Sequence, residues 1–287
     1  MKVVYGITPT KQVPAAGIAV SGLAGQGLEV VAHNGIAAIV SDAPPFDYAS
    51  LPKQQLVKVL SQHQYTTEQI MRVTATLLPV KFGTLLNRRD VEKMLAQACP
   101  DFTQALDNLK GNIEVELIVI WDPQRVFVEL AQTPEIAELL SLAPGLPPEQ
   151  VQQLQIAVGV RVKQLLDARR EQIAQIVQGA LSELATDVEA NAIVNDQVVA
   201  NFAFLLPEAN QSEFERRVES LDEQFGGNLT FKVVGPLPPY SFGTVEIEHL
   251  LPEDIAWARE ILGLSFAATG EQIRAGLLAA SATGASG

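Results

Sequence analysis

Short apolar segments separated by turn residues open the chain. Residues 2–7, 28–34 and 36–42 are rich in Val and Ile. Asn34–Gly35 stands at the junction of the last two segments, and this dipeptide favours the positive φ angles of a tight hairpin turn. The pattern therefore predicts a first strand followed by a β-hairpin.

Helix and strand patterns alternate after the hairpin. Over Leu51–Leu78, apolar residues recur at steps of three and four, which predicts one helix or two in tandem, ended by Pro79. A further helix is expected around Val91–Leu109, and the apolar run Ile113–Trp121 suits a buried strand. This order of elements predicts an α+β domain over residues 1–130, with a ferredoxin-like arrangement as one candidate topology.

A long helix is the main feature of the middle of the chain. Thr133–Pro134 is typical of an N-cap and first turn, and it begins a short helix that ends in the proline-rich residues 144–148, the best candidate for a linker. Apolar residues then recur at helical spacing over residues 151–188. A helix of roughly 40 residues extends about 60 Å, so we expect it to span between two units or to pair with another helix.

The pattern after the long helix predicts a second, smaller α+β unit. Val198–Leu206 is an apolar strand, and Ser212–Glu215 matches a capping box for a helix that runs to Phe225. Leu229–Val234 alternates as a strand, and Phe242–Ile247 is a further strand candidate.

These patterns divide the chain into three parts. An N-terminal α+β domain covers residues 1–130, and residues 131–248 hold the linker, the long helix and a C-terminal α+β domain. Residues 249–287 form an extension, with an amphipathic helix over Glu253–Leu262 and a tail of small residues over 279–287 that we expect to be mobile. The predicted fold is thus α+β, with two domains joined by the long helix or packed on it.

Composition limits the classes of partner. The 287 residues are 47% hydrophobic and carry a formal net charge of −13, which repels nucleic acid and anionic lipid surfaces. The chain contains neither a secretory signal pattern nor an apolar run long enough for a membrane span. We therefore expect a cytoplasmic protein with neither a nucleic acid nor a lipid membrane as partner.

The residues that carry chemistry do not form a known catalytic or metal-binding pattern. His33, His63 and His249 lack metal-ligand spacing, and the single Cys99 excludes an internal disulfide. Ser241 lacks the flanking glycines of a nucleophile elbow. We therefore predict no catalytic residue, no cofactor and no metal. A histidine or carboxylate hydrogen-bonded to Ser241 or Cys99 in a closed pocket would argue against this prediction.

Two segments combine residues that restrict the backbone with aromatic side chains. Proline fixes φ and restrains the residue before it, so these segments are expected to be stiff. We expect them chiefly to set the fold, with Phe82 and Phe242 substantially buried; an exposed docking surface is the alternative. The candidate residues, structural or interacting, are Pro79, Phe82, Gly83, Gly235, Pro236, Pro238, Pro239, Tyr240 and Phe242.

The same two segments carry a resemblance to a known family. Pro79–Thr84 reads P-V-K-F-G-T and Gly235–Phe242 reads G-P-L-P-P-Y-S-F, and over residues 2–248 the chain resembles the gas vesicle protein GvpF/GvpL family. The resemblance implies a minor structural component or assembly factor that binds the hydrophobic wall protein GvpA, prevents its aggregation during vesicle nucleation and meets other gas vesicle proteins. It also implies a location in the cytoplasm in association with gas vesicles, without catalytic activity or cofactor.

An alternative from another class stays open. A small-molecule-binding or catalytic α+β protein would use a cleft between the two domains. Perturbed titratable groups that converge on one cavity would favour this alternative, whereas an exposed apolar patch without a ligand cleft would favour the assembly protein.

Overall fold

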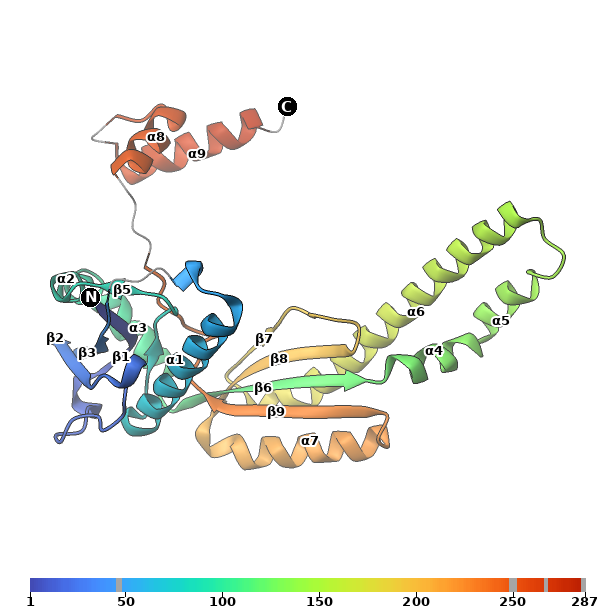
Figure 1. Cartoon of the computed structure of the whole chain (residues 1–287), viewed down its shortest axis with the longest axis horizontal. Coiled ribbons are helices and arrows are strands. Elements are labelled where there is room, and N and C mark those ends of the chain that lie inside the picture. The colour runs from blue at the N-terminus through green and yellow to red at the C-terminus, as the bar shows by residue number, and fades with distance from the viewer. Residues whose placement is uncertain (45–47, 248–251, 266–267, 285–287) are drawn as a thin grey trace. The chain divides into compact units, whose positions relative to one another are not determined.

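Two antiparallel sheets build the larger of two units, Met1–Val245, while Glu246–Gly287 forms the smaller one. The computed structural model describes residues 1–287 apart from 45–47, 248–251, 266–267 and 285–287. Helices flank both sheets, so the predicted α+β fold class is confirmed (Figure 1). None of the described helices combines the length and apolar composition that crossing a lipid bilayer requires.

The first sheet contains the predicted hairpin. Asn34 and Gly35 have φ angles of 42° and 88°, and they place His33 opposite Ile36. The strand order is β2-β3-β1-β4, with β5 also paired to β1. The strands are β1 (Lys2–Pro9), β2 (Leu28–His33), β3 (Ile36–Asp42), β4 (Leu78–Pro79) and β5 (Leu85–Leu86).

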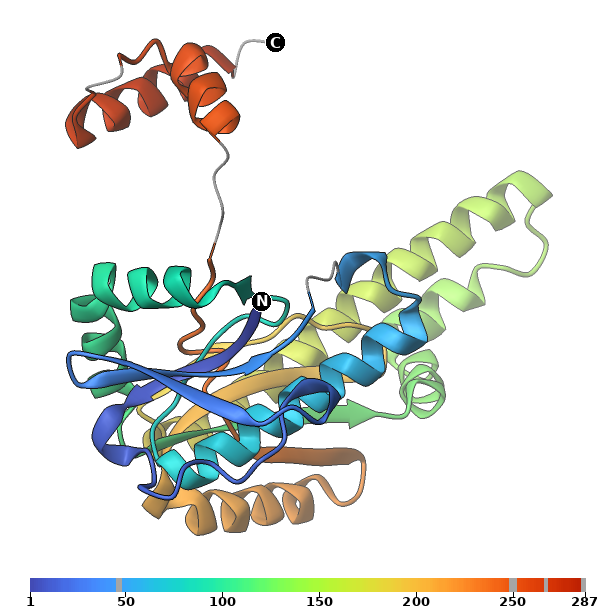
Figure 2. The ribbon, with the colours of Figure 1, turned by 60° about the vertical axis from the view of Figure 1, so that its left-hand side comes forward.

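Helices cover this sheet on both sides, as Figure 2 shows. They are α1 (Lys53–Thr74), α2 (Arg88–Gln97) and α3 (Cys99–Leu109). The prediction that Pro79 ends the first helix is wrong: Ala75 takes a left-handed conformation, and the following residues return to pair with β1. The helix predicted over Val91–Leu109 is two helices, because Ala98 leaves the helical conformation between them.

The second sheet has the ferredoxin-like topology. Its order is β7-β8-β6-β9, and every neighbouring pair is antiparallel. Helices connect β6 to β7 and β8 to β9, which gives the β-α-β-β-α-β sequence of that fold. The strands are β6 (Asn112–Trp121), β7 (Asp187–Ala190), β8 (Val198–Pro207) and β9 (Leu229–Leu237), and the helices that pack on them are α6 (Pro148–Leu181) and α7 (Gln211–Phe225).

The strand expected to close the N-terminal domain therefore belongs to the second sheet. Ile113–Trp121 forms as predicted, but its partners β8 and β9 come later in the chain. The ferredoxin-like topology proposed for residues 1–130 is thus found in the second sheet instead. An apolar strand can pair within either sheet and bury its side chains there, so its sequence does not identify its partner strands. The division of the chain at residues 130 and 248 stays a prediction.

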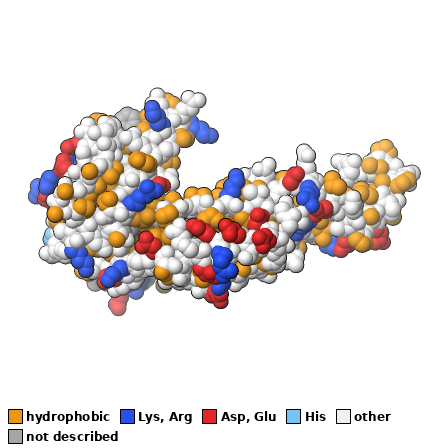
Figure 3. Space-filling view, turned by 90° about the horizontal axis from the view of Figure 1, so that it is seen from below, with side chains coloured by type: hydrophobic (Ala, Val, Ile, Leu, Met, Phe, Trp, Pro, Cys, Tyr) orange, Lys and Arg blue, Asp and Glu red, His pale blue; other side chains and the backbone are white. Residues whose placement is uncertain are grey.

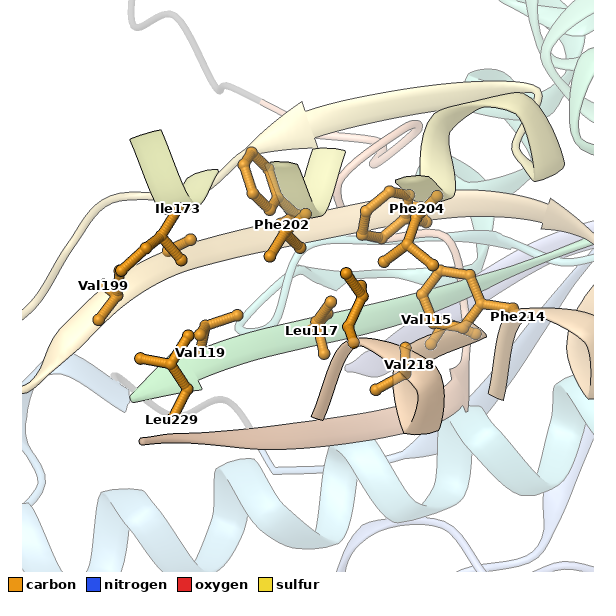
Figure 4. Packing of buried hydrophobic residues seen from close by; sticks show 14 of the residues in the cluster. Val115, Leu117, Val119, Ile173, Val199, Phe202, Phe204, Phe214, Val218 and Leu229 are labelled. Carbon is orange, nitrogen blue, oxygen red and sulfur yellow. The ribbon is translucent and has the colours of Figure 1, made fainter. Parts of the chain in front are cut away.

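One face of the second sheet makes a continuous core with α6 and α7 (Figure 4). Alternate residues Val115, Leu117 and Val119 of β6 point into it, as the two-residue period of a strand requires. Phe204 is fully buried, and its ring centroid lies 5.0 Å from that of Phe214 on α7. This core fixes β6, which carries one of the site residues on its opposite face.

A group of three helical segments projects from the second sheet (Figure 1). It consists of α4 (Pro123–Ala131), α5 (Pro134–Ser141) and the first half of α6, and we call residues 123–167 the helical arm. The whole of α6 has 34 residues, or about 51 Å at 1.5 Å per residue. Its early part packs against α5, so the prolines of residues 144–148 turn the chain between two helices rather than linking two domains.

Two local signals in the second half were misread. Ser212 lies inside α7, which follows a 3-10 turn and has no side-chain cap, so the capping box is wrong. Phe242–Ile247 forms no strand, because Val245 makes only an isolated bridge with Val80. Gly226, with φ of 59°, ends α7 as expected.

The smaller unit is a pair of helices. Helix α8 (Pro252–Leu262) ends before Gly263 as predicted, and it packs on α9 (Gly270–Gly284) through Gly276, which lies against Leu262. Helix therefore continues into the expected tail as far as Gly284, and mobility stays a prediction there. The end of the tail and His249 lie outside the described residues.

Candidate functional site

The two motif segments, far apart in sequence, lie side by side. The Lys81 backbone N–H donates to the Val245 carbonyl at 2.9 Å, and the Val245 N–H donates to the Pro79 carbonyl at 2.9 Å. Because β4 also pairs with β1, these bonds attach the residues just after the second motif to the first sheet. The sequence identified both segments but gave no sign that they meet.

A buried carboxylate fastens the second motif to β6. Glu114 is 4% exposed, and its carboxylate accepts from the Ser241 backbone N–H at 2.8 Å and from the Ser241 hydroxyl at 2.9 Å. Burial raises the pKa of Glu114, and the two bonds from Ser241 act in the opposite direction. Both carboxylate oxygens are thus occupied in holding one loop.

Gly235 begins the second motif at a point where the chain touches β6. Its φ is 149° and its peptide bond to Pro236 is cis. A Cβ at this position would meet the Glu114 carbonyl oxygen at 3.0 Å, so both conformation and space require glycine. Pro238 and Pro239 that follow are buried.

Aromatic rings connect the first motif to α1 and β1. The His63 ring stacks on Tyr5 at a centroid distance of 5.0 Å and meets the edge of Phe82 at 5.2 Å. Phe82 in turn contacts Tyr48 at 5.0 Å. His63 is 2% exposed, and burial lowers its pKa to about 4, with a hydrogen bond to the Val4 backbone acting in the opposite direction.

The motif aromatics are partly covered by the rest of the chain. Phe82, Tyr240 and Phe242 are all half-buried, and the expectation that the two segments chiefly set the fold stays a prediction. Burial of the hydroxyl nevertheless raises the pKa of Tyr240 to about 12.

These side chains surround one cavity of about 410 Å³. Its lining includes His63 from α1, Phe82 from the first motif, Glu114 and Glu116 from β6, and Tyr240 and Ser241 from the second motif. Three titratable groups with shifted pKa values therefore converge on it. Such a convergence of perturbed titratable groups is what would favour a small-molecule-binding or catalytic protein.

The chemistry of the cavity is nevertheless that of a structural contact. The bond between Glu114 and Ser241 is of the kind that argues for catalysis in a closed pocket, but Ser241 is exposed to solvent. Its hydroxyl donates directly to the carboxylate, without the intervening imidazole that activates a serine in hydrolases. Across the described residues, no three His, Cys, Asp or Glu side chains gather as metal ligands.

Two of the residues that build this site were missed from sequence. Glu114 is one of two glutamates in a mostly apolar strand, and that break in pattern is a usable signal. The burial of His63 had no such signal, since helical spacing alone left it on a helix face. Gly22, in the loop before β2, has a packing role of its own, because a Cβ there would meet the Tyr5 hydroxyl at 2.7 Å.

Comparison with known proteins covers nearly the whole larger unit. The family model for the gas vesicle synthesis protein GvpL/GvpF matches residues 2–244. Gas vesicle protein F of Microcystis aeruginosa is 24% identical over 83% of this chain and 96% of its own length. Gas vesicle protein L2 of Halobacterium salinarum is 25% identical over 83% of this chain and 90% of its own length.

Solved structures give the same similarity. The crystal structure of the gas vesicle protein GvpF from Anabaena sp. PCC7120 superposes with a TM-score of 0.71 and 25% identity, covering 87% of this chain and 98% of that one. The GvpF structure from Microcystis aeruginosa gives a TM-score of 0.66 at 23% identity, covering 84% and 98%, and shares the fold.

Proposed function

Because the chain belongs to the GvpL/GvpF family of gas vesicle synthesis proteins, we propose that it is a minor structural component or assembly factor of gas vesicles. In this role it binds the hydrophobic wall protein GvpA, prevents aggregation of GvpA during vesicle nucleation, and associates with other gas vesicle proteins. It works in the cytoplasm in association with the vesicle, and it is not an enzyme.

The observation that carries this proposal is an apolar surface on a strongly acidic protein. The net charge is −13, yet large apolar side chains are exposed along the helical arm, and Figure 3 shows hydrophobic side chains on the surface at the end of the arm. An exposed apolar surface on a soluble protein is typical of a protein–protein contact. The exposed side chains of the arm include Phe127, Val128, Leu140, Leu142, Ile156 and Val160.

The two motifs have a supporting role in this proposal. The backbone bonds between Lys81, Val245 and Pro79 attach the residues after the second motif to the first sheet, and the bonds from Ser241 attach that motif to the buried Glu114 of the second sheet. We therefore assign Pro79, Phe82 and the second motif to the framework that presents the arm. Neither a cofactor nor a metal enters this role.

The experiment is co-purification of the full chain with wall protein that is kept dispersed, at 0.1 M and 1 M salt. The Debye length falls from about 10 Å to about 3 Å over this range, so ionic contacts weaken while apolar contacts persist or strengthen. We expect binding to survive at 1 M salt. Absence of binding at both concentrations, or equal binding by an unrelated protein of similar negative charge, would contradict the proposal.

A small-molecule site is the second candidate, favoured by the convergence of His63, Glu114 and Tyr240 on the cavity of about 410 Å³. A bound compound would be retained through purification and released on denaturation. Mass spectrometry of the fraction released from the wild type, compared with that released from a Glu114→Gln variant, tests this candidate. A compound present in equimolar amount in the wild type and lost in the variant supports it, and its absence from both refutes it.

A further inference from the structure

A groove of about 520 Å³ lies where the helical arm joins the second sheet. Phe127 of α4 forms one wall, and Gly159, Val162 and Leu166 of α6 form the other. Trp121 lies beneath them, 4% exposed. Its indole N–H donates to the Asp196 carbonyl at 2.8 Å, so the floor of the groove is fixed by the fold.

Gly159 has no structural reason to be glycine. It lies inside α6, where glycine weakens a helix relative to alanine. Its φ is not positive, and a Cβ built there would meet nothing within 4 Å in the described part of the chain. Because glycine has no side chain, the wall of the groove is open at this position, and another chain can approach the α6 backbone closely.

An exposed apolar stripe continues from Gly159 toward the end of the arm. Ile156 lies one turn before Gly159 and is 62% exposed, and Val160 on the same side of the helix is 53% exposed. Phe127 across the groove is 48% exposed. Lys163, Asp167, Arg170 and Asp196 also line the groove. These charges are paired with one another, Lys163 with Asp167 and Arg170 with Asp167 and Asp196, so a charged end of the groove borders the apolar stripe, as a polar rim borders the apolar centre of protein interfaces.

Charge decides which partner fits this surface. From Leu139 to Val160 the only charged residue is Glu149, in a chain with 18% charged residues. Charges near the stripe are already paired, Arg161 with Glu135 at 3.6 Å within the arm and Arg169, just beyond it, with Glu129 at 2.9 Å. An uncharged apolar surface is the complement, whereas a second copy of this chain brings its own net charge of −13.

We propose that this groove and stripe are the docking site for an apolar segment of the gas vesicle wall protein, with the Gly159 position as the point of closest approach. The inference rests on the proposed function and deepens it by assigning the contact to the helical arm. The two motif segments, Pro79–Thr84 and Gly235–Phe242, lie outside this contact.

The test uses the full chain and the co-purification already described, with variants paired on one helix. Gly159→Leu fills the groove wall, and Gly179→Leu makes the same change in α6 outside the arm, also with nothing within 4 Å of its Cβ. Ile156→Glu places a charge on the stripe, and Gln178→Glu adds the same charge to α6 outside the arm. Gly159→Ala repeats the first test with the smallest side chain, and circular dichroism confirms folding of each variant.

We expect Gly159→Leu and Ile156→Glu to weaken binding of the wall protein at least tenfold at both salt concentrations. The two control variants should stay within twofold of the wild type. Melting temperatures should be unchanged, or raised in Gly159→Ala, since alanine is the better helix former.

The outcomes separate this inference from the proposed function. If the wild type binds the wall protein and folded Gly159→Leu and Ile156→Glu bind equally well, the docking site is refuted and the proposed function stands. If the wild type fails to bind, the proposed function fails and the docking site with it. If sedimentation shows a wild-type dimer that Gly159→Leu abolishes, the groove takes a second copy of this chain, which contradicts the proposed occupant.

Discussion

The buried His63 makes the fold sensitive to mild acid. Its ring is enclosed by Tyr5 and Phe82, and burial lowers its pKa to about 4 from an ordinary value of 6.5. A base with a depressed pKa in the folded state binds fewer protons there than in the unfolded chain between these two values. Its contribution is therefore fully present above pH 6.5 and is lost as the pH falls toward 4.

The size of this effect follows from the same two values. One pH unit of proton linkage corresponds to about 1.4 kcal/mol, so the interval from 6.5 to about 4 gives roughly 3 kcal/mol of stability lost by pH 4. Glu114 and the other carboxyl groups also titrate as the pH falls. They are the same in a His63→Gln variant, so comparison of the two proteins isolates the histidine.

The assay is urea unfolding of the wild type and His63→Gln at pH 7 and pH 4. We expect the unfolding free energy of the wild type to fall by about 3 kcal/mol more than that of the variant. His33→Gln on the hairpin is the matched control and should follow the wild type. Parallel loss of stability in wild type and His63→Gln would refute the account of His63 as a buried neutral base that joins α1 to the first motif.

Four further changes test the contacts around the motifs and the core by urea unfolding. Ser241→Ala removes the hydroxyl bond to the buried Glu114 carboxylate, and we expect a loss of about 1–3 kcal/mol; an unchanged value would show that the backbone bond alone suffices. Gly235→Ala, at φ of 149° and against the Glu114 carbonyl, should cost about 1–3 kcal/mol, and a gain in stability would contradict the required glycine. Phe204→Ala in the second core should cost about 3–5 kcal/mol, and half-buried Phe82→Ala less; equal losses would contradict the assigned burial.

Local signals predicted local structure well. Asn34–Gly35 gave the hairpin because its two residues adopt the positive φ angles of the turn. The apolar run of β6 and the glycine that ends α7 were also predicted correctly. Each of these features depends on a few neighbouring residues, so a single sequence contains the information.

Pairing between distant segments was beyond such signals. The partners of β6 are set by the shared core of β8, β9 and their helices, which no local pattern encodes. The end of α1 at Ala75 was missed because an alanine with φ of 58° has no recognisable stop signal. The motifs were identified as important, but the attachment of the second motif to Glu114 depends on bonds between residues 127 positions apart.

The central claim is that this acidic chain binds the apolar wall protein and keeps it from aggregating. The most direct measurement is light scattering of wall protein diluted out of denaturant, with increasing amounts of the full chain at 1 M salt. We predict that the onset of aggregation is delayed in proportion to the chain added, and that Gly159→Leu removes the delay while Gly179→Leu keeps it. A delay no greater than that given by an unrelated acidic protein would contradict the account.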